Sequence, residues 1–203
     1  MAEQERVIVV GGGASGMMAA GTAAERGHRV LLLEKNRSLG RKLRITGKGR
    51  CNLTNLTDVE GLVEHLPGNG RFLRSAFYRF GPEDLIAFFT AWGLETKVER
   101  GNRVFPASDE AADVVTALER FLRAGHVEVW KESPVSRLLV EAGAIRGVQL
   151  RNGTELSAAA VILATGGASY PGTGSTGDGY CMACEVGHTI EPIRPSLVPL
   201  EVA

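Results

Sequence analysis

Residues 7–16 read VIVVGGGASG, and this stretch decides the fold class. Four β-branched residues run into glycines that satisfy the spacing Gly-x-Gly-x-x-Gly through Gly11, Gly13 and Gly16. In a strand–turn–helix unit, the first glycine permits a tight turn, the second lets the backbone approach a diphosphate, and the third lets the helix pack on the strand. The free N–H groups and dipole of the next helix favour an anion there. We therefore predict a dinucleotide-binding turn formed by Gly11, Gly12, Gly13, Ala14, Ser15 and Gly16.

A second strand follows at the spacing that such a unit requires. Residues 14–26 are rich in Ala and Met and predict a helix, Gly27 is a suitable end for it, and residues 29–33 predict a buried strand. Glu34 ends this strand, where a carboxylate can accept hydrogen bonds from the ribose hydroxyls of an adenosine. Because a carboxylate repels a 2′-phosphate, the bound group is predicted to be the ADP moiety of FAD or NAD rather than NADP.

The bulk composition excludes several classes of protein. The chain has 203 residues, enough for one substantial core, and its 23 basic and 23 acidic residues give no indication of nucleic acid or of an anionic membrane as partner. It has no apolar run of membrane-spanning length and no signal-peptide pattern. Three cysteines fit a reducing compartment better than a disulfide framework, so we expect a cytoplasmic protein.

The remaining pattern departs from a regular succession of βαβ units. Residues 135–141, 144–151 and 154–157 alternate in polarity and are separated by turn residues, which predicts a three-stranded antiparallel meander. Further helices are predicted at 71–79, 82–92, 109–123 and about 176–186, and further strands at 94–99, 127–130 and 160–164. A meander before a strand that ends in Ala-Thr-Gly resembles the glutathione-reductase-like flavoproteins. We therefore predict an α/β fold, a Rossmann-like FAD-binding domain of that type.

A basic, glycine-rich segment follows the second strand. Residues 40–50 hold five basic residues and three glycines and no acid. Arginine and lysine beside flexible backbone suit a phosphate-rich ligand. A solvated basic loop and an RNA-binding patch are the alternatives, and RNA is disfavoured because the loop has no aromatic residue on which a base could stack.

Four motifs together resemble a known family. GGGASGMMAA, GRKLRITGKGRCNLTN, GNRVFPASDEAADVV and ATGGASYPGTGSTGDGY occur in that order across nearly the whole chain. They are similar to the YhiN/BaiN-type family of FAD-containing NAD(P)-dependent oxidoreductases. The resemblance implies that FAD is the cofactor, that NAD(P)H is the electron donor, and that the second motif wraps around the flavin through Arg41, Lys42, Thr46, Gly47, Gly49, Cys51, Asn52 and Asn55.

Other candidate site residues lie on both sides of the meander. Lys35 follows the ribose carboxylate, and the strand ending in Ala164, Thr165, Gly166 and Gly167 is expected to return the backbone to the cofactor. The resemblance makes Arg103 and Phe105 candidates for the substrate side, and Tyr170 lies in the Gly/Ser/Thr-rich loop that could face the flavin ring. Ser108 or Asp109 is a candidate N-cap for the helix at 109–123.

The sequence assigns no catalytic acid, base or metal ligand. Cys181 and Cys184 form a Cys-x-x-Cys pair, but inside a predicted helix a thiolate lacks the stabilisation of a helix N-terminus, so redox activity is not expected there. Cys51 is the better candidate for a thiol near the flavin. The four histidines are scattered, and no second ligand pair is present for zinc.

In the resembled family the chain enters an inserted, mainly β domain near Ser196 and later returns to complete the flavin domain. We therefore expect residues 1–192 to form an FAD-binding domain and 193–203 to begin the insertion. The chain is then a fragment, or one half of a split protein whose other half is a separate chain.

The function expected from these observations is flavin-mediated hydride transfer from NAD(P)H to an electron-poor small molecule, such as a conjugated enone, with neither nucleic acid nor membrane as partner. Two alternatives remain open. One is a dehydrogenase that uses NAD alone, and the other is a non-enzymatic module that binds a nucleotide or RNA.

Overall fold

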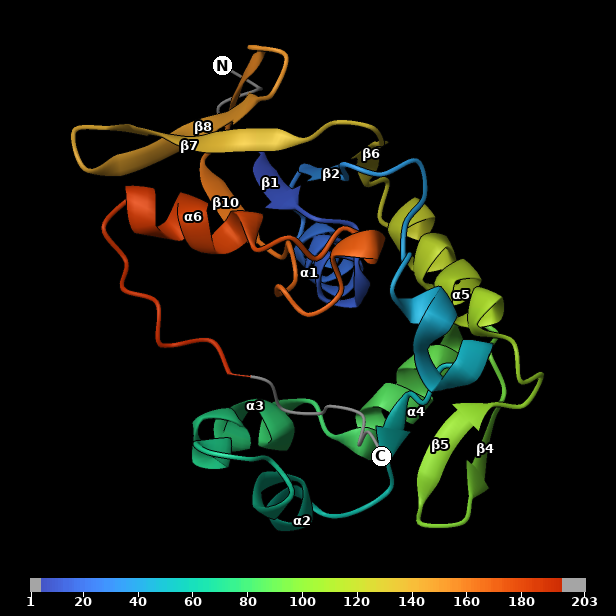
Figure 1. Ribbon diagram of the computed structural model, residues 1–203. Helices are drawn as coiled ribbons and strands as arrows, with labels where there is room; N and C mark the ends of the chain where they lie inside the picture. The colour runs from blue at the N-terminus through green and yellow to red at the C-terminus, as the bar shows by residue number, and fades with distance from the viewer. Residues whose placement is uncertain (1–4, 195–203) are drawn as a thin grey trace. The chain divides into compact units, whose positions relative to one another are not determined.

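The computed structural model describes residues 5–194, and these form two compact units. The first unit is assembled from residues 5–43 and 118–191, and the second from residues 44–117 and 192–194. Each unit has its own sheets and core, and each is described by itself (Figure 1).

A parallel sheet of four strands forms the centre of the first unit. Its strands are β1 (Val7–Val10), β2 (Val30–Leu33), β6 (Glu128–Trp130) and β10 (Ala160–Leu163), in the order β10-β1-β2-β6. Val7 pairs with Val30 on one side and with Ala160 on the other. The residues of β1 and β2 are all buried, as expected for central strands of a parallel sheet that is covered on both faces.

Different elements cover the two faces of this sheet. Helix α1 (Ala14–Glu25) packs on β1, β2 and β10. On the other face, Ile8, Val10, Leu31 and Leu33 share one apolar core with buried residues of the meander. The meander consists of β7 (Val135–Glu141), β8 (Ala144–Leu150) and β9 (Glu155–Ser157), paired antiparallel in that order. The first unit therefore has three layers: helix, parallel sheet and meander.

Two more helices belong to this unit. The C-terminal half of α5 (Ala111–Ala124), from Leu118, lies in it, and α6 (Asp178–Glu185) contacts β7. Phe121 of α5 is buried against α1. Its ring lies so close to Gly21 that a side chain at that position would collide with it. A short 3-10 turn, η3 (Pro171–Thr173), lies in the loop before α6.

The second unit combines short helices with a small antiparallel sheet. Its sheet has the order β3-β5-β4. Phe89, Leu94, Val104 and Phe105 are among its buried apolar side chains. Its elements are η1 (Leu43–Gly49), β3 (Thr54–Asn55), α2 (Val59–Glu64), η2 (Gly70–Leu73), α3 (Arg74–Arg79), α4 (Pro82–Ala91), β4 (Thr96–Glu99), β5 (Arg103–Pro106) and the start of α5.

The structure confirms the predicted α/β class, the parallel sheet with its helices and the three-stranded meander. Three predictions need correction. Residues 59–64 form a helix and 103–106 a strand that the sequence analysis did not predict. Helix α5 begins at Ala111, so Asp109 does not cap it. Instead, Asp109 has a left-handed backbone with φ 62°, and its carboxylate accepts hydrogen bonds from Arg50 and Lys97.

The domain boundary expected at 192/193 stays a prediction, and nearly all of 193–203 lies outside the described residues. Within residues 5–194, no helix has both the length and the apolar composition needed to cross a bilayer.

Candidate nucleotide site

Close packing explains three of the four glycines in the turn after β1. Gly11 has φ 109°, and a side chain there would collide with the carbonyl of Ala164. A side chain at Gly16 would collide with the carbonyl of Gly11, and one at Gly12 with Leu39. Because these neighbours are backbone atoms or a buried side chain, the turn can close against β10 only with glycine at these positions.

Gly13 differs from its neighbours because its Cα faces open space. A Cβ built there meets nothing within 4 Å, and the backbone, with φ −80° and ψ −171°, is extended and open to any residue. Gly13 is the N-cap of α1, yet no side chain caps the helix and its first turn holds no acid. The first N–H groups of α1 are thus left for an anion, and the missing side chain lets that anion approach closely.

Glu34 fixes the turn from the end of β2. Its side chain is buried, with 7% of the residue exposed. One carboxylate oxygen accepts from the Gly12 amide at 2.6 Å, and the other accepts from the backbone and side-chain amides of Asn36 at 2.7 and 2.6 Å. A carboxylate offers about four acceptor positions, so about one remains for a ligand hydroxyl. The residue can therefore hold both the turn and a ribose.

Asn36 is a site residue that the sequence analysis missed. Besides donating to Glu34, it accepts from Arg41 Nη1 at 3.1 Å through its side-chain oxygen. Gly40 N donates to Gly12 O at 2.8 Å, so residues 36–40 fold back over the glycine turn. The available signal was a second polar residue two positions after the strand-ending carboxylate.

Lys35 joins this region to the Gly/Ser/Thr-rich loop of the same unit. Its Nζ donates to Thr176 Oγ1 and Asp178 Oδ2, each at 2.6 Å. Partial burial raises the pKa of Asp178, but hydrogen bonds from Lys35 and Thr176 outweigh this and keep the pKa below its usual range. Lys42 Nζ donates to Ser169 Oγ at 3.2 Å. Two segments that the sequence assigned to the ligand are therefore tied together.

The end of β10 is packed tightly by α6. A side chain at Gly179 would collide with Thr165 Oγ1, and one at Gly167 would lie 3.3 Å from the hydroxyl of Tyr180. Gly166 has φ 76°, which favours glycine. Ala164 and Thr165 thus lie beside the glycine turn of β1, because both have atoms within 3.0 Å of a side chain placed at Gly11. Contacts of Ala164, Thr165, Gly166 and Gly167 with a ligand stay predictions.

In the second unit, Arg50 anchors the basic loop. Its Nε donates to Asp109 Oδ1 at 2.8 Å, it forms a further ion pair with Glu99, and its guanidinium lies 4.1 Å from the ring centroid of Phe105. Lys97 Nζ donates to Asp109 Oδ2 at 2.5 Å. Hydrogen bonds from Lys97 and then Arg50 lower the pKa of the Asp109 carboxyl. Arg50 is therefore a structural cation of this unit.

The other predicted flavin-side residues of this unit hold the same loop. Gly47 has φ 55° and lies against Asn52 and Phe105, and η1 is interrupted at Thr46–Lys48. The Asn52 amide lies 3.1 Å from the carbonyl oxygens of Thr54 and Val104, and Asn55 Nδ2 donates to Gly101 O at 2.7 Å. Burial raises the pKa of the Cys51 thiol. Contacts of Thr46, Gly47, Gly49, Cys51, Asn52 and Asn55 with a ligand stay predictions.

The three substrate-side candidates differ in exposure. Phe105 is only 3% exposed, whereas Arg103 is exposed and Tyr170 is 57% exposed. Cys181 and Cys184 are both exposed free thiols on α6. Within residues 5–194, no three His, Cys, Asp or Glu side chains are grouped to hold a metal ion.

Comparison with known proteins identifies the family. Residues 5–194 match the sequence profile described as the HI0933-like protein Rossmann domain. The chain belongs to the HI0933-like family. This confirms the predicted YhiN/BaiN-type family, which is one of FAD-dependent oxidoreductases.

Curated relatives match this HI0933-like chain along almost its whole length. It is 38% identical to a 3-dehydro-bile acid delta(4,6)-reductase of Clostridium scindens, over 97% of this chain and 47% of the relative. It is 34% identical to a ribosomal RNA dihydrouridine synthase of Escherichia coli, over 97% of this chain and 48% of the relative. The chain thus spans about half the length of these relatives.

Solved structures support the fold. The open conformation of a flavocytochrome c3 fumarate reductase superposes with a TM-score of 0.72 at 21% identity, covering 92% of this HI0933-like chain and 41% of that one. A 3-ketosteroid-delta4-(5alpha)-dehydrogenase from Rhodococcus jostii superposes with a TM-score of 0.61 at 17% identity, covering 81% and 46%.

Proposed function

We propose that this protein binds FAD and forms part of a reductase that uses NAD(P)H to reduce a carbon–carbon double bond conjugated to a carbonyl group. The observation that carries the proposal is the pairing of an uncapped helix start beside Gly13 with the buried carboxylate of Glu34. One is a donor set for a diphosphate, and the other is an acceptor for a ribose.

The residues present fit the ADP half of FAD. The amides at the start of α1 would hold the diphosphate, Gly13 would admit it, and Glu34 would accept from the adenosine ribose. When bound, FAD supplies the hydride-transfer chemistry, and the protein supplies its position. The basic residues Arg41 and Lys42 lie in the segment that follows Glu34 and donate to Asn36 and Ser169, and they would add positive charge for the phosphates.

The substrate class is inferred from what two relatives share. A 3-oxo bile acid with 4,6-unsaturation is a conjugated dienone, and uridine carries its 5,6-double bond next to the C4 carbonyl. Reduction of either compound adds a hydride to the β carbon, or to a carbon further along the conjugated system, and a proton to another carbon of that system. In the proposed reaction NAD(P)H supplies the hydride and becomes NAD(P)⁺. We therefore propose the conjugated carbonyl as the reacting group, in a small molecule or in a uracil base.

The first experiment is the visible absorbance spectrum of the purified protein, with identification of the ligand released on denaturation. We expect oxidised flavin bands and released FAD. Colourless protein that fails to take up added FAD but binds NAD would contradict the proposal and favour a dehydrogenase that uses NAD alone.

The second experiment resolves donor and acceptor. Flavin-loaded protein is mixed with NADH or NADPH without oxygen, and the loss of flavin absorbance is followed. A 4-en-3-oxosteroid or a uridine-containing RNA is then added, and return of the absorbance identifies the acceptor. Reoxidation by neither compound, in a protein that NAD(P)H does reduce, would contradict the proposed substrate class.

A further inference from the structure

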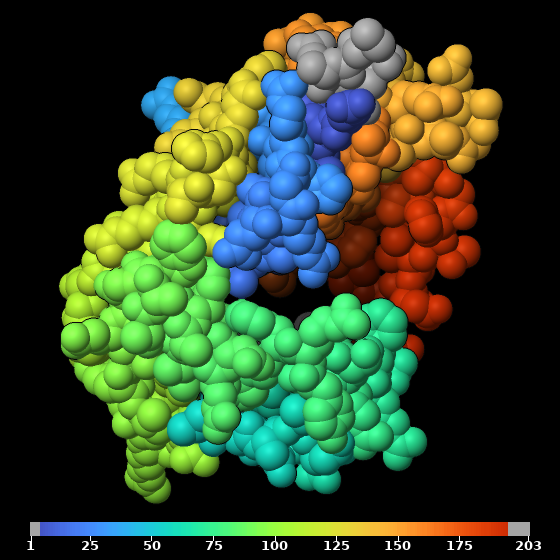
Figure 2. Space-filling model, turned by 180° about the vertical axis from the view of Figure 1, so that it is seen from behind, coloured from blue at the N-terminus to red at the C-terminus, as the bar shows by residue number. Residues whose placement is uncertain are grey.

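Residues 70–80 of the second unit are rich in arginine and in exposed aromatic side chains. Their sequence, GRFLRSAFYRF, contains Arg71, Arg74 and Arg79, and it has no acidic residue. Phe72 is 79% exposed, Tyr78 is 67% exposed and Phe80 is 41% exposed. Residues 70–80 have the teal-green colour of this part of the chain in Figure 2. Proteins seldom expose several large aromatic side chains in so short a segment unless the segment has a partner. We call residues 70–80 the arginine–aromatic segment.

Two of its arginines remain available to a partner. Arg74 is paired with Glu60, whereas Arg71 and Arg79 have no carboxylate partner within residues 5–194. Guanidinium groups bind phosphates through two parallel hydrogen bonds and stack on planar rings. Within eleven residues the segment therefore carries both unpaired positive charge and exposed rings, the two features that proteins commonly use to bind single-stranded nucleic acids.

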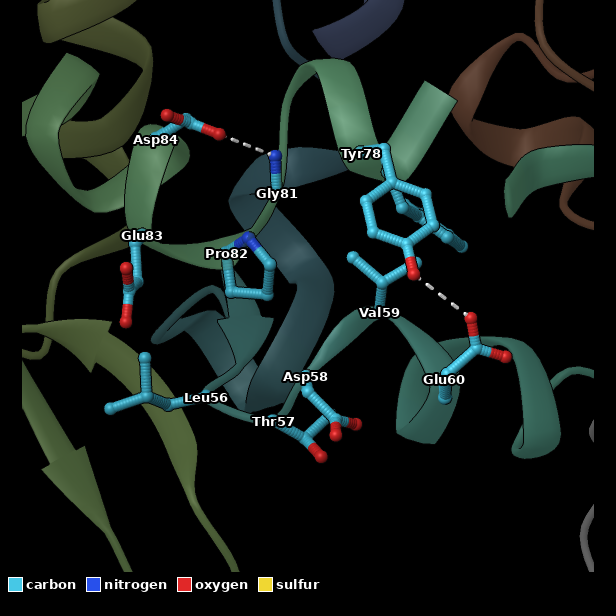
Figure 3. A pocket seen from close by; sticks show the side chains of 11 residues that line it. Leu56, Thr57, Asp58, Val59, Glu60, Tyr78, Gly81, Pro82, Glu83 and Asp84 are labelled. Carbon is cyan, nitrogen blue, oxygen red and sulfur yellow. Dashed lines mark hydrogen bonds between the residues drawn. The ribbon is translucent and has the colours of Figure 1, made fainter. Parts of the chain in front are cut away.

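A pocket opens beside the segment. It has a volume of about 590 Å³, and Leu56, Val59, Phe77, Tyr78 and Pro82 supply its apolar walls (Figure 3). This volume lies within the range of about 300–1,000 Å³ that is usual for small-ligand sites.

Most carboxylates around this pocket are already engaged. Asp84 accepts from Gly81 N, and Glu60 accepts from the Tyr78 hydroxyl (Figure 3). Asp58 accepts from Gly61 N, and Glu60 also pairs with Arg74. Glu83 also lines the pocket. Its carboxylate has no hydrogen-bond donor among residues 5–194, so it can accept one from the N–H group of a base.

The distribution of charge over the segment and the pocket indicates which chemical groups of a partner each of them would bind. The acidic pocket repels phosphate but accepts hydrogen-bond donors, while Arg71 and Arg79 attract phosphate. An apolar protein segment would need neither the arginines nor the acidic pocket. An RNA strand with unpaired bases matches both.

We propose that the arginine–aromatic segment binds single-stranded RNA: Arg71 and Arg79 contact phosphates, Phe72 and Tyr78 stack on unpaired bases, and the pocket receives one unstacked base. The choice of RNA rests on the uracil-containing substrate proposed above. The sequence analysis disfavoured RNA because residues 40–52 lack an aromatic residue, and this segment supplies the aromatic residues elsewhere in the chain.

Binding of a fluorescently labelled, unstructured, uridine-containing RNA by the full chain tests the proposal. Fluorescence anisotropy should show binding that weakens with salt and weakens when the RNA is converted to a duplex. Arg71→Gln with Arg79→Gln should reduce the slope of log K against log salt by about 1.4, from about 0.7 per phosphate contact. The control removes two exposed arginines elsewhere, Arg26→Gln with Arg123→Gln, and should reduce the slope less.

Substitutions at Phe72 separate stacking from simple apolar contact. Phe72→Tyr should retain the affinity for RNA, whereas Phe72→Leu should weaken it roughly 5- to 150-fold, because base stacking on an aromatic ring contributes about 1–3 kcal/mol. Val98→Leu, at a 52% exposed position on β4, is the control and should have no effect. Equal affinity of the Phe72→Leu and wild-type proteins for RNA would overturn the proposal. A lower thermal unfolding midpoint of Phe72→Leu would also overturn it, because it would show that residue 72 is packed against protein.

The two proposals fail separately. A flavin-containing protein that reduces a 4-en-3-oxosteroid but binds no RNA overturns this inference alone. A protein that binds RNA through Phe72 but takes up no FAD overturns the proposed function alone.

Discussion

At the scale of single residues, the turn after β1 contains three glycines that the fold needs and one, Gly13, that close packing does not require. Gly11, Gly12 and Gly16 lack room for a side chain, whereas Gly13 has it. The Gly-x-Gly-x-x-Gly spacing alone cannot make this distinction, because all these positions are the same residue type. Only the placement of the neighbouring Ala164 and Leu39 shows which glycine faces outward.

Gly13→Ala and Gly16→Ala should therefore differ in kind. In Gly13→Ala we expect an unchanged thermal unfolding midpoint without ligand and an FAD affinity at least about tenfold lower, equivalent to about 1.4 kcal/mol, because the methyl group occupies the space of the diphosphate. In Gly16→Ala we expect a lower unfolding midpoint without any ligand. Calorimetry and flavin-fluorescence titration measure the two quantities, and equal FAD affinity of Gly13→Ala and wild-type would contradict the assignment.

Asp109 gives a pH prediction. Lys97 and Arg50 lower the pKa of its carboxyl, so this group stabilises the folded state above its unfolded pKa, and the contribution is lost as the pH falls through the lower folded pKa. Asp109→Asn keeps a residue type that tolerates a φ of 62°.

The unfolding midpoints of the wild-type and Asp109→Asn proteins should consequently differ at neutral pH and converge below about pH 4. The measurement is thermal unfolding followed by circular dichroism over this range. A difference that persists unchanged at about pH 2 would show that the charge is not its cause.

At the scale of elements, the sequence best predicted the helices and strands that have a strong local sequence pattern. The buried strands of the parallel sheet and the hairpins of the meander were found, because continuous apolar runs and tight turns such as Asn152-Gly153 are local signals. Strand β5 was missed, and its sequence gives only a weak strand signal because it ends in Pro106 and proline usually argues against a strand. Here Pro106 pairs with Thr96 at the end of the strand, where a missing N–H is tolerated. The six-residue helix α2 was missed although Asp58, which caps it, was a usable signal.

Helix α5 gives the element-scale prediction. Phe121 is 1% exposed and packs on Gly21 of α1, so Phe121→Ala should lower the free energy of unfolding by about 3–5 kcal/mol. Chemical denaturation measures the change. Thr116→Ala on the same helix is the control, because its hydroxyl only bonds back to the Ala112 carbonyl, and an equal effect of both substitutions would contradict the packing role.

At the scale of the whole molecule, bound FAD should stabilise the fold by mass action. At a free FAD concentration of about 100 times Kd the gain is about 2.7 kcal/mol, which corresponds to a rise of about 5–10 °C in Tm for a chain of this size. Riboflavin lacks the ADP half for which the glycine turn and Glu34 are suited, so its effect should be much smaller. Differential scanning fluorimetry with both ligands measures this, and equal shifts would contradict the placement of the ADP half.

The parts of the candidate site that the sequence could predict are those formed by residues close together in the sequence. Glu34 and the glycine turn could be located from spacing, because the βαβ geometry is local in sequence. The pairing of Lys35 with Asp178 could not, since it joins residues that only the folded sheet brings together. Nor could the burial of Phe105 beneath Arg50, which depends on the pairing of β4 with β5.

The insertion of residues 44–117 within the nucleotide-binding unit also constrains how the chain folds during synthesis. β1 pairs with β10, so Val7 can pair with Ala160 only after residue 160 has been synthesised. In contrast, β3, β4 and β5 pair entirely within residues 54–106. Closing the longer loop costs more entropy, and ribosomes release the N-terminal part first. The second unit can therefore form on the ribosome while β1 and β2 are still exposed apolar strands. The nascent chain is then most vulnerable to aggregation until residue 163 has emerged, and a chaperone that shields β1 and β2 would act in that interval.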